Sequence, residues 1–160
     1  MSEDAEGSDP LRDGRQSDRA LAILRGTCRL LRSFGFAPVT ELALSTGHRA
    51  DIVALGPRGE IWIAEVKSSL EDFRTDQKWH HYNEHCDRLF FAVSDTFPAE
   101  IIPPETGLII ADKFGAAIIR EAPEDRLAAA RRKQVQLRFA RAAALKLHGL
   151  ADPGAATPTR

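Results

Sequence analysis

The chain has 160 residues, of which 43% are hydrophobic and 28% are charged, values that are ordinary for one soluble globular domain. Its formal net charge of −1 gives no overall electrostatic case for nucleic-acid binding, so any basic surface must be local. The sequence contains no apolar run of about 18 residues and no signal-peptide pattern, so we expect a cytoplasmic protein without a membrane segment. Cys28 and Cys86 lie far apart and fit reduced cytosolic thiols better than a disulfide.

The two ends of the chain are expected to be disordered tails. Residues 1–16 are polar and lack hydrophobic periodicity, and residues 151–160 are rich in Pro, Ala and Gly. One domain is therefore predicted over residues 17–150.

A helix is predicted over residues 18–34 and a strand over residues 36–44. Ser17 is a favourable N-cap and a glycine follows the helix. The apolar stripe of this helix consists of Leu21, Leu24, Cys28, Leu31 and Phe34. The strand carries Glu41, which either faces solvent from an edge strand or contributes to a nearby site.

The stretch RADIVALGPRGEIWIAEVKSS, residues 49–69, predicts a β-hairpin. Two apolar runs, 50–55 and 61–66, flank a Gly-Pro-Arg-Gly sequence. Proline at the first loop position and glycine at the third suit a three-residue loop that ends in a left-handed glycine.

This loop fixes which residues of the hairpin face each other. Antiparallel pairing sets Leu55 against Ile61 and places Asp51 opposite Glu65. Because side chains alternate along a strand, Lys67 joins Glu65 on the same face. The other positions on both faces are apolar, which predicts a strand pair that is covered on both sides.

Two neighbouring carboxylates near a core are costly unless something compensates their charge. A lysine alone would neutralise one of them, whereas a hard divalent cation such as Mg²⁺ would accommodate both. Bound Mg²⁺ polarises a phosphoryl oxygen and lowers the pKa of a bound water. The alternative is a partly exposed Asp-Lys-Glu network with a structural role, and the spacing alone does not decide between the two.

A helix over about residues 70–84 is predicted after the hairpin. Two serines precede it, and each is followed three residues later by an acid, which is the capping-box pattern. Lys78 and Tyr82 on this helix are candidates to contact a DNA strand. Trp79 is expected to pack against the sheet instead. Zinc is not expected here, because the nearby histidines and cysteine lack further ligands at a recognisable spacing.

The rest of the domain predicts one more strand, a second hairpin and a long helix. The apolar run 88–93 is a strand, and 98–102 is a short helix. Residues 107–111 and 116–120 flank a turn and predict the hairpin. The last helix is expected over residues 123–148.

The last helix is basic. Seven Lys or Arg residues and no acid lie between residues 126 and 148. Arg131, Arg132 and Lys133 are candidates to neutralise DNA phosphates, although solvated basic faces are common and basic residues suit a helix C-terminus. Arg49, two residues before Asp51 and on the same face, is a candidate for a phosphate contact or an acid partner.

Two features resemble known proteins. Asp51, the hairpin and Glu65-Val66-Lys67 resemble the bipartite D…ExK signature of the PD-(D/E)xK nuclease superfamily, with Ala50 in place of the proline of the name. The longer stretches RADIVALGPRGEIWIAEVKSSLEDFRTDQKWHHYNEHCDRLFFAVSDTFPAEIIP and RRKQVQLRFARAAAL are similar to the MmcB family of bacterial DNA-repair-associated proteins. This similarity covers about residues 16–150.

The resemblance implies an α/β domain of restriction-endonuclease-like fold. Its αβββαβ core would have a mixed sheet flanked by helices, with the second hairpin added at the edge and a long C-terminal helix. Several branches of the superfamily carry Gln-x-x-x-Tyr beside the metal site. Gln77 matches the glutamine, while Tyr82 follows one residue later than that spacing.

The resemblance also implies roles for the site residues. Asp51 and Glu65 would bind Mg²⁺ or Mn²⁺, with the Val66 carbonyl as a third ligand and Glu41 as an additional acid. Lys67 would orient or activate the attacking water and stabilise charge on the phosphate.

The expected function is metal-dependent hydrolysis of DNA phosphodiester bonds during repair. The alternative is a DNA-binding or scaffold protein of the same fold with little or no nuclease activity. RNA, flap and junction substrates are not distinguished by the sequence. DNA is the expected partner, and a homodimer or a repair-protein partner is not evident from the sequence.

Overall fold

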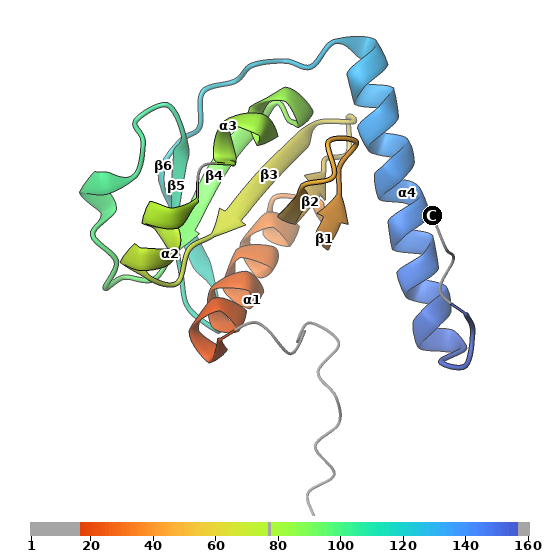
Figure 1. The fold of residues 1–160 in the computed structure, drawn as a ribbon, viewed down its shortest axis with the longest axis horizontal. Coiled ribbons are helices and arrows are strands. Elements are labelled where there is room, and N and C mark those ends of the chain that lie inside the picture. The colour runs from red at the N-terminus through yellow and green to blue at the C-terminus, as the bar shows by residue number, and fades with distance from the viewer. Residues whose placement is uncertain (1–16, 77, 157–160) are drawn as a thin grey trace, which may run out of the picture.

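A six-stranded mixed sheet forms the centre of the computed structural model, which describes residues 17–76 and 78–156 (Figure 1). The strands lie in chain order, β1-β2-β3-β4-β5-β6. In chain order the elements are α1 (Asp18–Ser33), β1 (Ala37–Ala43), β2 (Arg49–Leu55), β3 (Ile61–Val66), α2 (Leu70–Thr75), α3 (Trp79–Tyr82), the 3-10 helix η1 (Asn83–His85), β4 (Arg88–Val93), the 3-10 helix η2 (Ala99–Ile101), β5 (Gly107–Ala111), β6 (Ala116–Arg120) and α4 (Ala129–Ala151). Strand β4 pairs in parallel with β3 and β5, and the other pairs are antiparallel.

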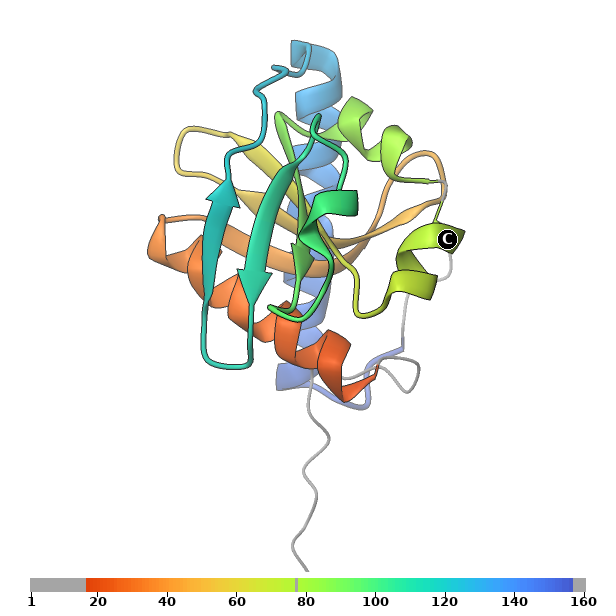
Figure 2. The ribbon, with the colours of Figure 1, turned by 90° about the vertical axis from the view of Figure 1, so that its left-hand side faces the viewer.

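Helices cover both faces of the sheet: α1 packs on one face, and α4, which lies at the back in Figure 2, packs on the other. On one face Leu24 of α1 packs with Ile52 and Phe90 of the sheet. On the other face Phe139 of α4 packs with Ile63. The central strands are therefore buried on both sides, as their continuous apolar runs predicted.

The predicted register of the first hairpin is confirmed. Leu55 pairs with Ile61, and the Gly56 N–H donates to the Glu60 carbonyl at 2.8 Å. Gly59 has a φ of 89°, the left-handed conformation that the third loop position requires. The hairpin thus brings the ends of β2 and β3 together in the expected alignment.

The first helix begins where the sequence predicted, with the Ser17 side chain accepting a hydrogen bond from the Ala20 N–H at 3.1 Å. Its end differs from the prediction, because Phe34 is 48% exposed and lies outside the apolar stripe. The Phe36 N–H reaches back to the Leu31 carbonyl at 3.0 Å, which turns the chain at the helix end. Phe36, and not Phe34, is consequently the aromatic ring that enters the core.

The prediction of one continuous helix over residues 70–84 is wrong. Helix α2 ends at Thr75, and Asp76 has extended backbone angles (φ −86°, ψ 111°) before α3 begins at Trp79. The Asp76 side chain accepts the Lys78 N–H at 2.7 Å. Such a local side-chain bond competes with the helical ladder and favours a turn.

The predicted start of the last helix at residue 123 is also wrong, since α4 begins at Ala129 and ends at Ala151. The preceding segment bonds to Asp87 instead of forming helical hydrogen bonds. The Asp125 N–H donates to the Asp87 carbonyl at 2.8 Å, and the Leu127 N–H donates to the Asp87 carboxylate at 2.9 Å. These long-range bonds hold residues 123–128 in an extended path.

Neither cysteine is in a disulfide. Burial raises the pKa of the Cys28 thiol to about 11, so this thiol is unreactive at neutral pH. Among the described residues, no helix is long and apolar enough to cross a membrane.

Replacing Gly26 by alanine is expected to lower the free energy of unfolding by about 1–3 kcal/mol. A Cβ atom at this position of α1 would lie 2.0 Å from the Asp112 carbonyl oxygen and 2.4 Å from the Gly115 carbonyl oxygen. Both are backbone atoms of the turn between β5 and β6, so they cannot rotate away. Equilibrium urea denaturation measures the effect.

The matched control is Gly149→Ala in α4, where an added Cβ atom would have no neighbouring atom within 4 Å. This variant is expected to be neutral or to gain up to about 1 kcal/mol from helix propensity. A Gly26→Ala protein as stable as wild type would contradict the close approach of α1 to the turn.

Candidate functional site

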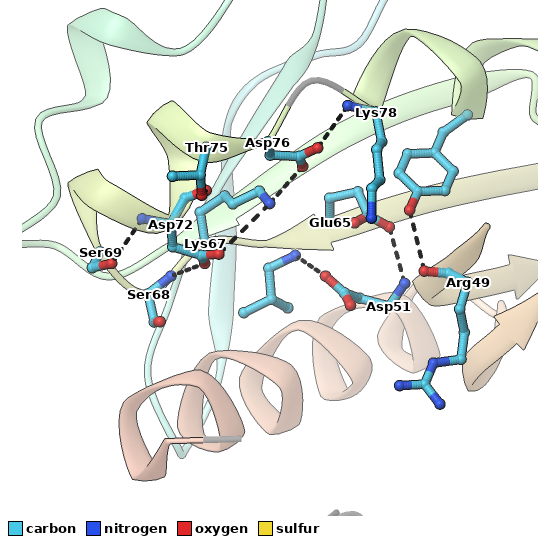
Figure 3. Close-up of polar contacts among 12 residues, drawn as sticks. Arg49, Asp51, Glu65, Lys67, Ser68, Ser69, Asp72, Thr75, Asp76 and Lys78 are labelled. Carbon is cyan, nitrogen blue, oxygen red and sulfur yellow. Dashed lines mark hydrogen bonds and ion pairs between the residues drawn. The ribbon is translucent and has the colours of Figure 1, made fainter. Parts of the chain in front are cut away.

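A cleft of about 500 Å³ opens where β2 begins and β3 ends (Figure 3). Seven of the residues predicted to form the site line this cleft: Arg49, Asp51, Glu65, Val66, Lys67, Lys78 and Tyr82. The walls are completed by Ser17 and Ala20 at the start of α1 and by Ser68, Asp72, Thr75 and Asp76. The hairpin register and the short α2–α3 segment thus gather residues that are far apart in the sequence.

Asp51 and Glu65 are fixed by reciprocal bonds across the hairpin. The Asp51 N–H donates to Glu65 Oε1 at 2.9 Å, and the Val66 N–H donates to Asp51 Oδ2 at 2.8 Å. Each carboxyl therefore has a defined orientation that does not depend on flexible surface contacts.

The pair is electrostatically costly. Burial raises the pKa of Asp51, and burial together with the charge of Asp51 raises the pKa of Glu65 well above its ordinary value. Glu65 is only 3% exposed, so water does little to screen the repulsion. A cation bound between the two carboxylates would relieve this repulsion.

Lys67 is a buried cation held by acids of the α2 region. Its Nζ lies 2.5 Å from Asp76 Oδ2 and 4.0 Å from Asp72 Oδ1. Burial disfavours the ammonium form, but the hydrogen bond and charge of Asp76, with Asp72 and Glu65, raise the pKa of Lys67. Lys67 is therefore positively charged at neutral pH.

Asp76 and Asp72 are site residues that the sequence interpretation missed. Asp76 makes two contacts at once, one to Lys67 and one to the Lys78 N–H. Because a continuous helix was predicted over residues 70–84, Asp76 was not expected to lie in the cleft. The available signal was local, because an aspartate side chain often accepts the N–H of the residue two positions later and so favours this kind of turn.

Glu41 does not join the carboxylate pair. Its backbone has a φ of 56°, and its Oε1 lies 3.8 Å from the Arg49 guanidinium. Within residues 17–76 and 78–156, no group of three or more His, Cys, Asp or Glu side chains is arranged to hold a metal. The structure therefore brings Asp51 and Glu65 together without a third acidic ligand.

The predicted DNA-contacting residues of the α2–α3 region differ in exposure. Lys78 is exposed at the cleft, whereas Tyr82 is buried and its hydroxyl donates to the Arg49 carbonyl at 3.2 Å. Trp79 packs edge-on against Phe91, as expected. Gln77 lies outside the described residues.

The predicted basic residues of α4 are placed away from the carboxylate pair. Arg132 makes a bidentate ion pair with Asp87, which directly precedes β4, with distances of 2.6 and 2.7 Å. Because β3 and β4 are parallel, Asp87 lies at the opposite end of the sheet from Glu65. Arg131 contacts His85 Nε2 at 2.8 Å, and Lys133 is exposed. Two of the three residues thus have partners within the fold.

The donor set of the cleft suits Mg²⁺ or Mn²⁺. It consists of carboxylate oxygens without imidazole or thiolate, and Mg²⁺ typically uses one or two carboxylates with several waters. The N–H and carbonyl of a strand residue point to the same edge, so the Val66 carbonyl faces the same side as Asp51. Asp51, Glu65 and Val66 therefore fit a hard divalent cation.

Comparisons with known proteins identify the family. Over residues 7–154 the sequence matches the family described as DNA repair protein MmcB-like. A solved structure of a protein of unknown function from Silicibacter pomeroyi matches with a TM-score of 0.86 and 46% sequence identity. The match covers 91% of this chain and 99% of that chain. A comparison with curated proteins gave no match. The chain belongs to the MmcB-like family of DNA repair proteins.

Proposed function

We propose that the protein is a Mg²⁺- or Mn²⁺-dependent deoxyribonuclease of the PD-(D/E)xK superfamily. The observation that carries the proposal is the side-by-side pair of the half-buried Asp51 and the buried Glu65, with the Lys67 ammonium in the same cleft. These residues stand in the D…ExK order on a hairpin. The description of the family as DNA repair proteins supports DNA as the substrate.

The order of the elements supports a restriction-endonuclease-like fold. One helix, three antiparallel strands, a helical segment and a strand parallel to the third follow one another, as in the αβββαβ core that the resemblance implies. The β5–β6 pair extends the sheet at one edge and α4 covers β1. The candidate site lies at the end of the hairpin, where the superfamily signature places it.

The cation ligands and Lys67 have separate roles in the proposed chemistry. Asp51, Glu65 and the Val66 carbonyl would hold the divalent cation, which when bound supplies a Lewis acid for a phosphoryl oxygen. Lys67 carries a positive charge that Asp76 stabilises, so it orients water and offsets negative charge on the phosphate. Its raised pKa disfavours activation of the water by proton transfer to Lys67.

Exposed cations at the mouth of the cleft would bind the DNA backbone. Arg49 has a side chain that is 52% exposed, and Lys78 is also exposed. Phosphate contacts of this kind position a nucleic acid without reading its sequence. Arg49 and Lys78 are therefore the described residues that we assign to DNA binding at this site.

The test is cleavage of labelled single-stranded, nicked, flapped and duplex DNA by purified protein. Each substrate is incubated with Mg²⁺, Mn²⁺ or a chelator, and Lys67→Ala serves as the catalytic variant. Cleavage that needs metal and is lost in Lys67→Ala supports the nuclease. Binding of DNA without cleavage of any substrate supports the scaffold alternative instead.

Replacing Asp76 by asparagine is expected to lower kcat about tenfold or more, in the range of lost outer-shell partners of metal sites. Asparagine keeps the acceptor for the Lys78 N–H but loses the charge that holds Lys67 at 2.5 Å. The turn should therefore survive while the ammonium becomes less fixed. Steady-state kinetics on the best substrate of the panel measures the loss.

Asp72→Asn is the matched control, because Asp72 is farther from Lys67, at 4.0 Å, and its side chain is 46% exposed. Its kcat is expected to stay within about twofold of wild type, as for other exposed pairs. Equal losses in both variants, or a faster Asp76→Asn enzyme, would contradict the positioning role of Asp76.

A further inference from the structure

Helix α4 has two apolar faces on opposite sides. Val135 and Phe139 are buried against the sheet and form the inner face. A second set of apolar residues is exposed on the other side of the helix. This set, the outer stripe, consists of Leu137, Ala140, Ala144 and Leu147.

Among the residues that the structure describes, the outer stripe belongs to no hydrophobic core cluster. Leu137 is 60% exposed and Leu147 is 68% exposed. One apolar face suffices to dock a surface helix, so a second face requires another explanation. Isolated exposed leucines are common, but these two belong to a regular pattern.

The spacing of the stripe matches a helix-packing seam. Its residues are separated by three, four and three positions, which is the a/d pattern of a heptad repeat. Ala140 and Ala144 lie between the two leucines. Small residues allow a second helix to approach closely, while the leucines pack at either end of the contact. A helix interacting with a membrane surface would instead present a continuous face of bulky side chains.

The charges beside the stripe indicate which helix would bind. No acid occurs from residue 126 to residue 151. Four basic side chains of α4 bond to the rest of the fold: Arg131, Arg132, Arg138 and Lys146. Lys133 and Arg141 are exposed and, within the described part of the chain, have no hydrogen bond or ion pair.

Lys133 and Arg141 flank the stripe, being four residues before and after Leu137. A second copy of α4 would bring like charges together, which disfavours self-association through this face. An acidic partner would pair with them.

We propose that the outer stripe of α4 docks an acidic amphipathic helix of a partner protein. That helix would place leucine-like residues on the stripe and Glu or Asp beside Lys133 and Arg141. The contact lies on α4, on the side of the helix that faces away from the sheet, and does not depend on the proposed nuclease activity. It would connect the domain to another protein through its C-terminal helix.

The test is fluorescence anisotropy with a labelled synthetic helix that carries Leu at a and d positions and Glu at e and g positions. A peptide of the same composition in scrambled order is the second probe. The protein variant is Leu137→Lys with Leu147→Lys. The matched variant is Leu145→Lys with Leu150→Lys, which adds the same charge at two exposed leucines off the stripe.

The patterned peptide is expected to bind wild type and the matched variant within about twofold of each other. The stripe variant is expected to bind at least tenfold more weakly, which corresponds to about 1.4 kcal/mol. Charge attraction alone predicts the opposite, because two added lysines would strengthen binding of an acidic peptide. Urea denaturation of both variants checks that the fold is retained.

Several results would overturn the proposal. They are no binding of the patterned peptide, equal binding of the scrambled peptide, or equal binding by the stripe variant. Analytical ultracentrifugation showing a dimer that the stripe substitutions dissociate would assign the stripe to a second copy. Binding of anionic vesicles or of duplex DNA that only the stripe substitutions abolish would assign it to those ligands.

Discussion

Replacing Asp51 by asparagine is expected to lower metal-dependent DNA cleavage about a thousandfold. Loss of a carboxylate ligand removes several kcal/mol of charge stabilisation by the cation, and about 1.4 kcal/mol corresponds to a factor of ten. Asparagine still accepts the Val66 N–H through its amide oxygen, so the end of the hairpin should keep its shape. Glu65→Gln is expected to behave in the same way.

The stability of Asp51→Asn separates lost chemistry from lost folding. The variant removes the charge of Asp51, which repels the buried Glu65 carboxylate, so its urea midpoint without metal should equal or exceed that of wild type. The control is Glu60→Gln, which changes a carboxylate at the loop end of the same hairpin, where it accepts the Arg58 N–H. Cleavage by Asp51→Asn within about tenfold of wild type would contradict the proposed ligand role.

Replacing Asp87 by alanine is expected to lower the free energy of unfolding by about 3–5 kcal/mol, the cost of removing one partner from a buried ion pair. The Asp87 carboxylate accepts the Ile61 N–H at 2.8 Å and the Leu127 N–H at 2.9 Å. It also binds the Arg132 guanidinium at 2.6 and 2.7 Å. Alanine would leave two backbone donors and a cation without their acceptor.

Equilibrium urea denaturation measures this loss, with Asp125→Ala as the control. Asp125 is exposed, and only its backbone N–H contacts Asp87. A double variant with Arg132→Met should lose less than the sum of the single losses, because the buried charge is removed with its partner. A loss below about 1 kcal/mol for Asp87→Ala would contradict the account of this cluster.

The Asp87 carboxylate is expected to cause part of the pH dependence of the free energy of unfolding. Burial disfavours the charged form, but the Arg132 hydrogen bonds and two backbone N–H groups lower the pKa of Asp87 from its ordinary value of 3.8. Because the pKa of Asp87 is lower in the folded state than in the unfolded state, its ionised form stabilises the protein at pH values above the unfolded-state pKa. This stabilisation is lost as the pH falls through the folded-state pKa. Wild type should therefore lose more stability than Asp87→Ala between neutral pH and pH values below 3.8.

The parts of the fold fixed by local chemistry could be predicted from the sequence. The Pro57-Arg58-Gly59 loop determined the hairpin register, and that register brought Asp51 and Glu65 together. The strand over residues 88–93 has the predicted bounds, because an apolar run between polar residues leaves little choice. The N-cap at Ser17 could also be predicted, because its hydrogen bond to the Ala20 N–H is local in the sequence.

The parts that depend on long-range charge pairs could not be predicted. The capping-box pattern predicted one continuous helix, but the bonds of Asp76 to the distant Lys67 and to the Lys78 backbone end α2. Asp87 lies about forty residues before the segment whose backbone it binds. Arg132 looked like a DNA contact because its partner is distant in the sequence. Only tertiary structure shows which charges already have partners.

Binding of a divalent cation by the Asp51–Glu65 pair can be measured without knowing the DNA substrate. Electron paramagnetic resonance would follow Mn²⁺ binding to wild type, Asp51→Asn and Glu60→Gln, with Mg²⁺ as competitor. We expect wild type and Glu60→Gln to bind Mn²⁺ at a site from which Mg²⁺ displaces it, and Asp51→Asn to lack this site. If wild type binds no Mn²⁺, or binds it no better than Asp51→Asn does, the pair is not a metal site.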